Sequence, residues 1–206
     1  MSAAIEQALA AALESGASGI GQIAISREQD RLVFTHRDDS KLSGLEIFAN
    51  AEAAIAIAKF DDAGNYRPLK TAPNLRHGWR MELVDLSDTA RALDYFYPGR
   101  LAGLLRWKRN ELITTPLRET LDRQSGMYRV AAKISDEQID DLVGSFCRTA
   151  GGCLRTILWK RDARGTIPST KLPPEKFDPR SAALPLLCQE ACNLLVNECR
   201  KVVKAE

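Results

Sequence analysis

The chain has 206 residues, of which 45% are apolar and 27% are charged, a composition typical of a globular protein with one large or two small domains. A formal net charge of +2 is too small to favour nucleic acid as a partner. No run of about 18 apolar residues is present, which argues against a membrane-spanning helix. Residues 1–16 carry Glu6 and Glu14 and no basic segment, so they indicate an amphipathic helix rather than a signal peptide, and we expect a cytoplasmic protein.

The first part of the chain predicts a hairpin flanked by helices. A helix over residues 1–16 ends at Gly16, near-alternating apolar residues over 20–36 surround the polar "REQD", and Asn50 caps a short helix. The polar stretch 61–78 contains Pro and Gly, and it predicts a domain boundary near residue 70.

The rest of the chain predicts mainly helices with short extended segments. "WRMELVDL" is typical of a strand, and Ser87 is the expected cap of the helix that follows. Residues 127–134 look extended, and Ser135 with Gln138 forms a capping box. Further elements are expected in this order: helices over 100–112 and 115–126, a short strand over 153–159, a polar loop over 160–184 and a last helix opened by Pro185.

Together these elements predict an α+β fold in two domains. Residues 1–70 form a small α+β domain with the hairpin and its helices. Residues 71–206 form a mainly helical domain with a short sheet, and this domain contains every cysteine.

The cysteines are clustered in a way that predicts a metal site. Five residues separate Cys147 from Cys153 across a Gly–Gly turn, and three residues separate Cys188 from Cys192, one turn apart on the predicted last helix. In a reducing compartment, clustered thiols bind metal or react more often than they form disulfides, and an odd number of cysteines does not favour a disulfide framework.

The spacing leaves several kinds of site open. Four thiolates suit zinc or an iron–sulfur cluster. Zinc knuckles usually place two residues between paired cysteines, so the wider spacing here fits the corners of a 4Fe–4S cube better. Buried thiols acting as small hydrophobic side chains, or a redox dithiol, remain alternatives. Cys199 continues the apolar stripe of the last helix and is expected to pack, with a ligand role left open.

The segments "TPLRETLDRQSGMYR" and "YPGRLAGLLRW" and the order of the cysteines resemble the C-terminal region of bacterial multidomain proteins built around a CbiX-type, sirohydrochlorin-chelatase-like core. In those proteins a stabilising domain and an iron–sulfur domain follow the chelatase part. The resemblance implies a 4Fe–4S cluster held by Cys147, Cys153, Cys188 and Cys192. It does not imply a chelatase, because this chain has only His36 and His77 and lacks the run of parallel-strand segments that such a unit needs.

Residues 90–134 contain an excess of Lys and Arg. Arginine forks suit carboxylates, so Arg118, Arg123 and Arg129 are candidates for binding an anionic tetrapyrrole in a common cleft. The plainer alternative is a solvated helix face, paired with acidic neighbours.

These observations favour a 4Fe–4S protein that transfers electrons or senses redox state, beside tetrapyrrole or cobalamin metabolism, with a redox partner or a chelatase-like protein. The alternative is a structural or interaction protein whose four-cysteine site, iron–sulfur or zinc, has no redox role. No P-loop, nucleophile elbow, dinucleotide fingerprint or HExxH motif occurs, so the sequence gives no support for an enzymatic activity.

Overall fold

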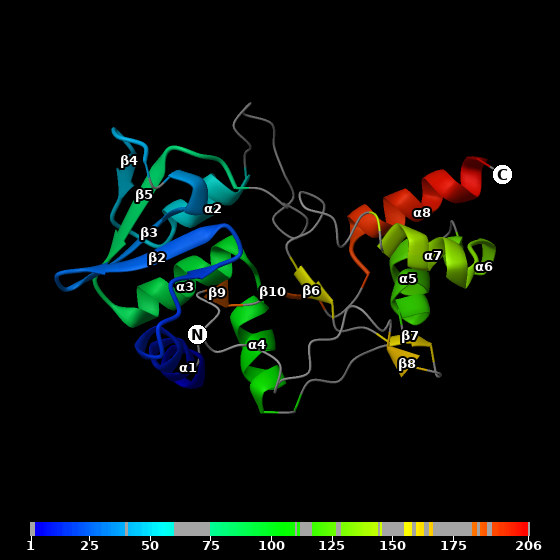
Figure 1. Ribbon diagram of the computed structural model, residues 1–206, viewed down its shortest axis with the longest axis horizontal. Coiled ribbons are helices and arrows are strands. Elements are labelled where there is room, and N and C mark those ends of the chain that lie inside the picture. Colours follow the sequence, from blue (N-terminus) through cyan, green and yellow to red (C-terminus); the bar gives the residue numbers. More distant parts are fainter. Residues whose placement is uncertain are drawn as a thin grey trace. The chain divides into compact units, whose positions relative to one another are not determined.

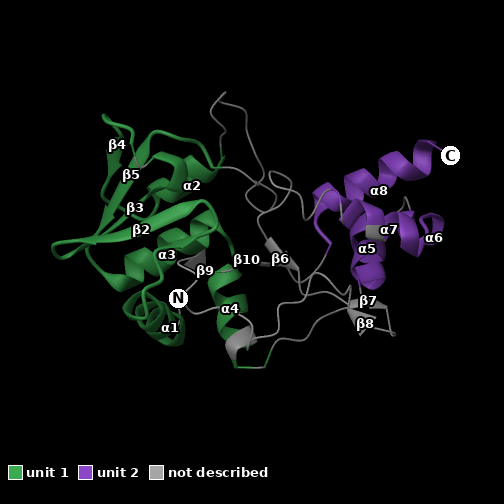
Figure 2. Cartoon of the chain, viewed as in Figure 1, with its two compact units in different colours: residues 1–111, 177–185 green, residues 112–176, 186–206 purple. Residues whose placement is uncertain are grey.

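The computed structural model describes two compact units of the chain (Figures 1 and 2). Unit 1 comprises Met1–Glu111 and Phe177–Pro185, and unit 2 comprises Leu112–Lys176 and Leu186–Glu206. The described residues are 3–39, 41–59, 75–109, 111, 117–126, 129–143, 145, 155–157, 160–162, 165–166, 183–184, 186–188 and 191–205. For the short strands between residues 155 and 166, and for Cys188, the description covers the backbone alone.

A mixed sheet forms the frame of unit 1. Its described strands follow the order β4-β5-β3-β2-β1-β9. The outer pairs β4–β5 and β1–β9 are parallel, and the inner pairs are antiparallel. The strands are β1 Gly19–Ile20, β2 Ile23–Glu28, β3 Arg31–His36, β4 Glu46–Phe48, β5 Trp79–Leu83 and β9 Ala183–Leu184.

The predicted hairpin is confirmed as β2 and β3, in which Ile25 faces Phe34 across the antiparallel pair. Its two-residue loop, Gln29 and Asp30, lies in the polar segment that the sequence indicated. Gln29 has a φ of 54°, the left-handed conformation that tight hairpin loops require.

Four helices of unit 1 are described, together with a short 3-10 turn, η1. Gly16 ends the first helix as predicted: at a φ of 94° it donates to the carbonyl of Leu13, and Ala17 donates to that of Ala12, which is a Schellman motif. The elements are α1 Ala3–Glu14, η1 Arg37–Asp39, α2 Ala53–Lys59, α3 Leu86–Phe96 and α4 Arg100–Lys108.

Asn50 caps α2 as predicted, because its side-chain oxygen accepts a hydrogen bond from the backbone N–H of Ala53 at 3.0 Å. The predicted cap of α3 is wrong. Asp85, not Ser87, accepts the hydrogen bond of the first turn, from the N–H of Asp88 at 2.7 Å. Asp85 has the extended backbone conformation that an N-cap residue needs. The helix therefore begins at Leu86, two residues before the start that a cap at Ser87 would give.

Helix α3 covers the buried face of β5. Trp79, Met81 and Leu83 alternate along β5 and are each at most 1% exposed. The Trp79 ring stacks on Phe96 of α3 with ring centroids 5.1 Å apart, and its indole N–H donates to the carbonyl of Arg76. This contact ties the sheet to the helical layer of unit 1.

The pairing of β5 also moves the expected domain boundary. Because β5 pairs with β3 over Leu32 to Thr35, residues beyond 75 belong to the same sheet as the hairpin. The boundary that the sequence predicted near residue 70 therefore falls inside unit 1, whose first segment extends to Glu111. A polar stretch that contains proline can connect two strands of one sheet as well as two domains, so this composition alone does not identify a domain boundary.

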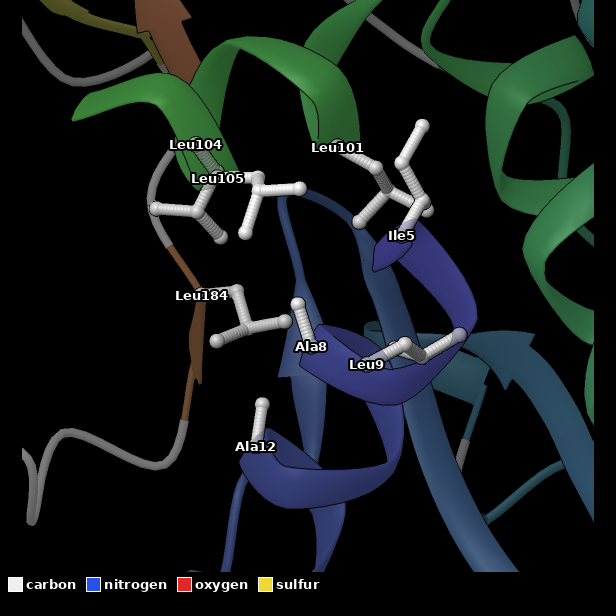
Figure 3. A pocket seen from close by; sticks show the side chains of 8 residues that line it. All are labelled: Ile5, Ala8, Leu9, Ala12, Leu101, Leu104, Leu105 and Leu184. Atoms are coloured by element: carbon white, nitrogen blue, oxygen red, sulfur yellow. The ribbon is translucent and has the colours of Figure 1, made fainter. Parts of the chain in front are cut away.

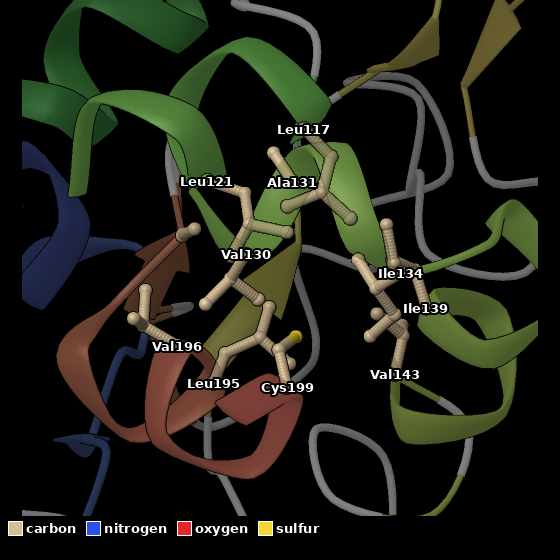
Figure 4. Close-up of a cluster of buried hydrophobic side chains, with 11 residues drawn as sticks. Leu117, Leu121, Val130, Ala131, Ile134, Ile139, Val143, Leu195, Val196 and Cys199 are labelled. Carbon is tan, nitrogen blue, oxygen red and sulfur yellow. The ribbon is translucent and has the colours of Figure 1, made fainter. Parts of the chain in front are cut away.

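Unit 2 is built on short helices and two-stranded sheets. Helices α5, α6 and α7 each contact α8, and their apolar side chains enclose one core (Figure 4). The sheets pair β10 with β6 in parallel and β7 with β8 in antiparallel fashion. The elements are α5 Leu117–Ser125, α6 Val130–Lys133, α7 Asp136–Leu142, β6 Arg155–Ile157, β7 Lys160–Asp162, β8 Gly165–Thr166, β10 Leu186–Cys188 and α8 Asn193–Ala205.

The capping box at the start of α7 is confirmed. The N–H of Ser135 donates to the side chain of Gln138 at 2.8 Å, and the N–H of Gln138 donates to the Ser135 hydroxyl at 3.2 Å. The extended conformation expected just before it is wrong, because Val130–Lys133 form the helical turn α6. That turn buries Val130 and Ala131 in the core, and a four-residue turn is too short to show a helical period in the sequence.

The fold is α+β, as the sequence predicted. Within the described residues the sheet of unit 1 has antiparallel pairs at its centre, unlike the doubly wound parallel sheet expected of a chelatase-like unit. Among the helices that the structure describes, none has the length and apolar character needed to cross a membrane.

Replacing Phe96 by Ala should destabilise unit 1 by about 3–5 kcal/mol, because it removes a large buried ring from the contact with Trp79. Hydrogen exchange of the β3 and β5 amides measures this change. Val84, which is 66% exposed, provides the control: Val84→Ala should change protection by less than about 0.5 kcal/mol. Equal effects from the two variants would contradict the assigned core.

Candidate metal centre

Cys192 lies at the beginning of α8. Its carbonyl accepts a hydrogen bond from the N–H of Val196 at 3.0 Å, so Cys192 occupies the N-cap position of a helix that runs over Asn193–Ala205. Its side chain is partly buried and packs against the apolar core of unit 2. The thiolate is the form of cysteine that binds metal, and the free N–H groups of the first turn of α8 lie at the same end of the helix as Cys192.

Thr120 of α5 fixes the residue that precedes Cys192. Its hydroxyl accepts a hydrogen bond from the backbone N–H of Ala191 at 3.0 Å and donates to the carbonyl of Leu117 at 2.8 Å. Thr120 is fully buried and Ala191 is 1% exposed, so both bonds lie in the dry interior of unit 2. The start of α8 is therefore tied to α5 immediately beside the Cys192 thiol.

Cys199 has a different environment from Cys192. It is fully buried within the core of unit 2, and Figure 4 shows its side chain directed in among the aliphatic side chains of that core. Burial raises the pKa of the Cys199 thiol to about 11. A protonated thiol packed on apolar neighbours behaves as a small hydrophobic group, which agrees with the packing role expected from the sequence.

Cys188 is not on the last helix. It is the last residue of β10, where it pairs with Ile157 of β6 in parallel register. The prediction that Cys188 and Cys192 lie one helical turn apart is therefore wrong. Periodicity cannot distinguish a short apolar run such as Leu186–Cys188 in a strand from the same run in a helix.

Cys147 and Cys153, with the predicted Gly–Gly turn between them, lie outside the described residues. Convergence of the four sulfurs therefore stays a prediction. The described part of the chain provides the thiol of Cys192, together with the backbone position of Cys188.

Arg118 forms hydrogen bonds within unit 2. Its guanidinium donates to the carboxylate of Asp136 at 2.5 Å, to the carbonyl of Ile134 at 3.1 Å and to the carbonyl of Ala131. These bonds fasten α5 to the connection between α6 and α7. For Arg118 this pairing agrees with the plainer alternative of an arginine paired with an acidic neighbour, and Arg123 and Arg129 are exposed. A common cleft for the three arginines stays a prediction.

The sequence gave no reason to single out Thr120, because a lone threonine in a helical pattern carries no signal of a distant partner. Its importance depends on a contact between α5 and a segment about seventy residues later, which only tertiary structure reveals. A buried hydroxyl that satisfies a buried N–H is the kind of contact that folded chains rarely leave unmade.

A narrow apolar pocket in unit 1 does not offer a second site (Figure 3). Eight aliphatic or alanine side chains of α1, α4 and β9 line it, without a polar group to orient a ligand. Its volume of about 10 Å³ leaves room for at most about one water molecule.

Comparison with known proteins finds a family match for each of the two parts of the chain. Residues 5–110 match the DR2241 stabilising domain, and residues 109–201 match a 4Fe-4S iron-sulfur cluster binding domain. The two matches meet at the end of unit 1, and the second covers all five cysteines. An α+β stabilising domain followed by an iron–sulfur binding domain is the class that fold and comparison define, and the chain belongs to the DR2241 stabilising-domain family.

The structure also resembles that of DR2241 from Deinococcus radiodurans, with a TM-score of 0.74 and 26% sequence identity. That protein is described as multi-domain, with structural similarity to chelatases and two additional novel domains. The match covers all of this chain and 43% of that one, so the chain spans less than half the length of its relative. A comparison with curated proteins finds no match.

Thr120→Val should destabilise unit 2 by about 1–3 kcal/mol, because it leaves the buried N–H of Ala191 without its acceptor. Thr120→Ser keeps the hydroxyl and should retain most of that stability, at the cost of one methyl group. Urea unfolding followed by circular dichroism compares the two variants. A valine variant as stable as the serine variant would show that the hydrogen bond does not hold the start of α8.

Without a bound cluster, Cys192 should react with iodoacetamide much faster than Cys199. At pH 8 a thiol with a pKa near 11 is ionised in only about one molecule in a thousand, and Cys199 is also shielded by the core. Peptide mass spectrometry after timed alkylation measures both rates in the same sample. Comparable rates at the two cysteines would contradict the placement of Cys199 in the core.

Proposed function

We propose that the chain binds a 4Fe–4S cluster through Cys147, Cys153, Cys188 and Cys192, and that the cluster transfers electrons or senses redox state. The observation that carries this proposal is the contrast between two thiols of one segment. Cys192 lies at the N-cap of α8 with its side chain only partly buried, whereas Cys199 is fully packed in the core. The match of residues 109–201 to a 4Fe-4S binding domain supports the choice of cluster.

The surroundings of Cys192, the predicted ligand whose side chain the structure describes, suit such a cluster. A 4Fe–4S cube held by four thiolates is anionic, and the free N–H groups in the first turn of α8 provide partial positive charge next to Cys192. Hydrogen bonds from backbone N–H groups to cluster sulfur adjust the reduction potential. Thr120 contributes by fixing the backbone just before this turn. Four cysteine ligands leave no iron open to substrate, which favours electron transfer over activation of a bound molecule.

We further propose a chelatase-like protein as the partner. The relative from Deinococcus radiodurans combines similarity to chelatases with additional domains in one chain, whereas the present sequence corresponds to 43% of that length. This proposal implies work beside tetrapyrrole metabolism, without assigning metal insertion to this chain.

Anaerobic reconstitution of the full chain with iron and sulfide tests the cluster. We expect about four irons and four sulfides per chain, with broad visible absorption. Cys192→Ala should lose most of the iron, and Cys199→Ala, the matched control on the same helix, should retain it. Full iron content in Cys192→Ala, or loss of iron in a folded Cys199→Ala variant, would contradict the ligand set.

The same sample separates a redox role from a structural one. A redox cluster should bleach on addition of dithionite and recover its absorption on reoxidation, with its iron retained. A cluster that is only structural should resist reduction or fall apart when reduced, while its removal still lowers the free energy of unfolding of unit 2.

A further inference from the structure

The only two histidines of the chain meet in unit 1, far from any cysteine in the sequence. His36 is the last residue of β3, and His77 lies two residues before β5, the antiparallel neighbour of β3. Their ring centroids are 3.9 Å apart, at an interplanar angle of 54°. The strand pairing brings these two imidazoles together although the residues are widely separated in the sequence.

A buried carboxylate completes the group. Asp39 of η1 is 2% exposed. One of its oxygens lies 2.5 Å from Nδ1 of His77, and the other accepts the backbone N–H of Gly78 at 2.8 Å. One potential ligand atom from each of His36, Asp39 and His77 lies within 4.8 Å of the others.

His36 is the member that ordinary packing does not explain. Its side chain is fully buried, its Nδ1 faces the backbone N–H of Asp38 at 3.3 Å, and its Nε2 has no hydrogen-bond partner in the described part of the chain. Buried polar atoms are nearly always paired, so an unpaired ring nitrogen beside a histidine and a carboxylate indicates a missing ligand. A simple His77–Asp39 hydrogen bond would account for those two residues but not for His36.

We propose that His36, Asp39 and His77 bind one divalent transition-metal ion of the kind that zinc represents. Two imidazoles and one carboxylate provide nitrogen and oxygen donors of intermediate hardness, which suit such ions. They differ in this from four thiolates, which are soft donors. Three protein ligands leave a further coordination position for water or an exogenous ligand, as in zinc sites that carry out chemistry rather than stabilise a fold. The partly exposed side chain of His77 gives the ion a route from solvent.

Binding requires an adjustment of the three side chains, because their potential ligand atoms lie up to 4.8 Å from one another. Metal–ligand bonds of about 2.0–2.2 Å place tetrahedral ligand atoms roughly 3.4 Å apart, so the short contact between Asp39 and His77 must lengthen by about 1 Å. The proton shared in that contact leaves for solvent as the metal ion takes its place.

Nuclear magnetic resonance of the full chain labelled with 15N-histidine tests the proposal with Zn²⁺ as the probe. Only two imidazole spin systems exist, so the readout is separate from zinc at any cysteine, and it remains valid whether or not a 4Fe–4S cluster forms. We expect a ring nitrogen of each histidine to shift on titration and both shifts to saturate with the same apparent dissociation constant. Histidine signals that stay unchanged at millimolar zinc, or that saturate independently, would overturn the proposal.

Two variants and a control sharpen the experiment. Asp39→Asn can still accept the N–H of Gly78 but should weaken zinc binding at least tenfold. His77→Gln changes a side chain that is 43% exposed, and His36 should then no longer respond to zinc. Glu46→Gln removes a carboxylate that is 57% exposed and pairs with Arg76, beside His77, and should leave zinc affinity within about twofold. Equal losses from Asp39→Asn and Glu46→Gln would show a general charge effect and contradict the site.

Discussion

The hydrogen bond between the Ala191 N–H and the Thr120 hydroxyl holds the residue before α8 against α5, and the positions of the thiols on α8 follow from where this helix begins. With Ala191 held to α5, Cys192 occupies the N-cap, beside the free N–H groups of the first turn. About two turns later Cys199 enters the core that α8 shares with α5, α6 and α7. One helix thus places one thiol at its partly buried N-terminus and another inside the apolar core.

The two units offer donor sets of different chemistry. Unit 2 contains the cysteines, which suit iron–sulfur clusters and other thiophilic metals, and unit 1 contains the group of His36, Asp39 and His77, which suits a borderline divalent ion. At the two proposed sites, sulfur donors are kept apart from nitrogen and oxygen donors, so the two metals would not compete directly for the same ligands.

Local signals made much of the fold predictable, whereas contacts between distant segments did not. The loop of the β2–β3 hairpin and the capping box of Ser135 and Gln138 are encoded within a few residues, and both are confirmed. Leu186–Cys188 was wrongly assigned to a helix, because an apolar run of that length fits a strand equally well and its partner β6 decides the outcome. The clustering of the cysteines indicated a metal site. The contact of Thr120 with Ala191 and the contact between the two histidines could not be predicted from the sequence, because both join segments that are distant along the chain.

An anomalous-difference map at the iron absorption edge, from crystals grown without oxygen, tests the central claim most directly. The account predicts one compact iron peak bonded to Sγ of Cys192 at the start of α8, with the three other predicted ligands around it. The Sγ of Cys199 should remain in contact with the aliphatic core and away from iron. Iron bonded to Cys199, or iron bound without Cys192, would contradict the account.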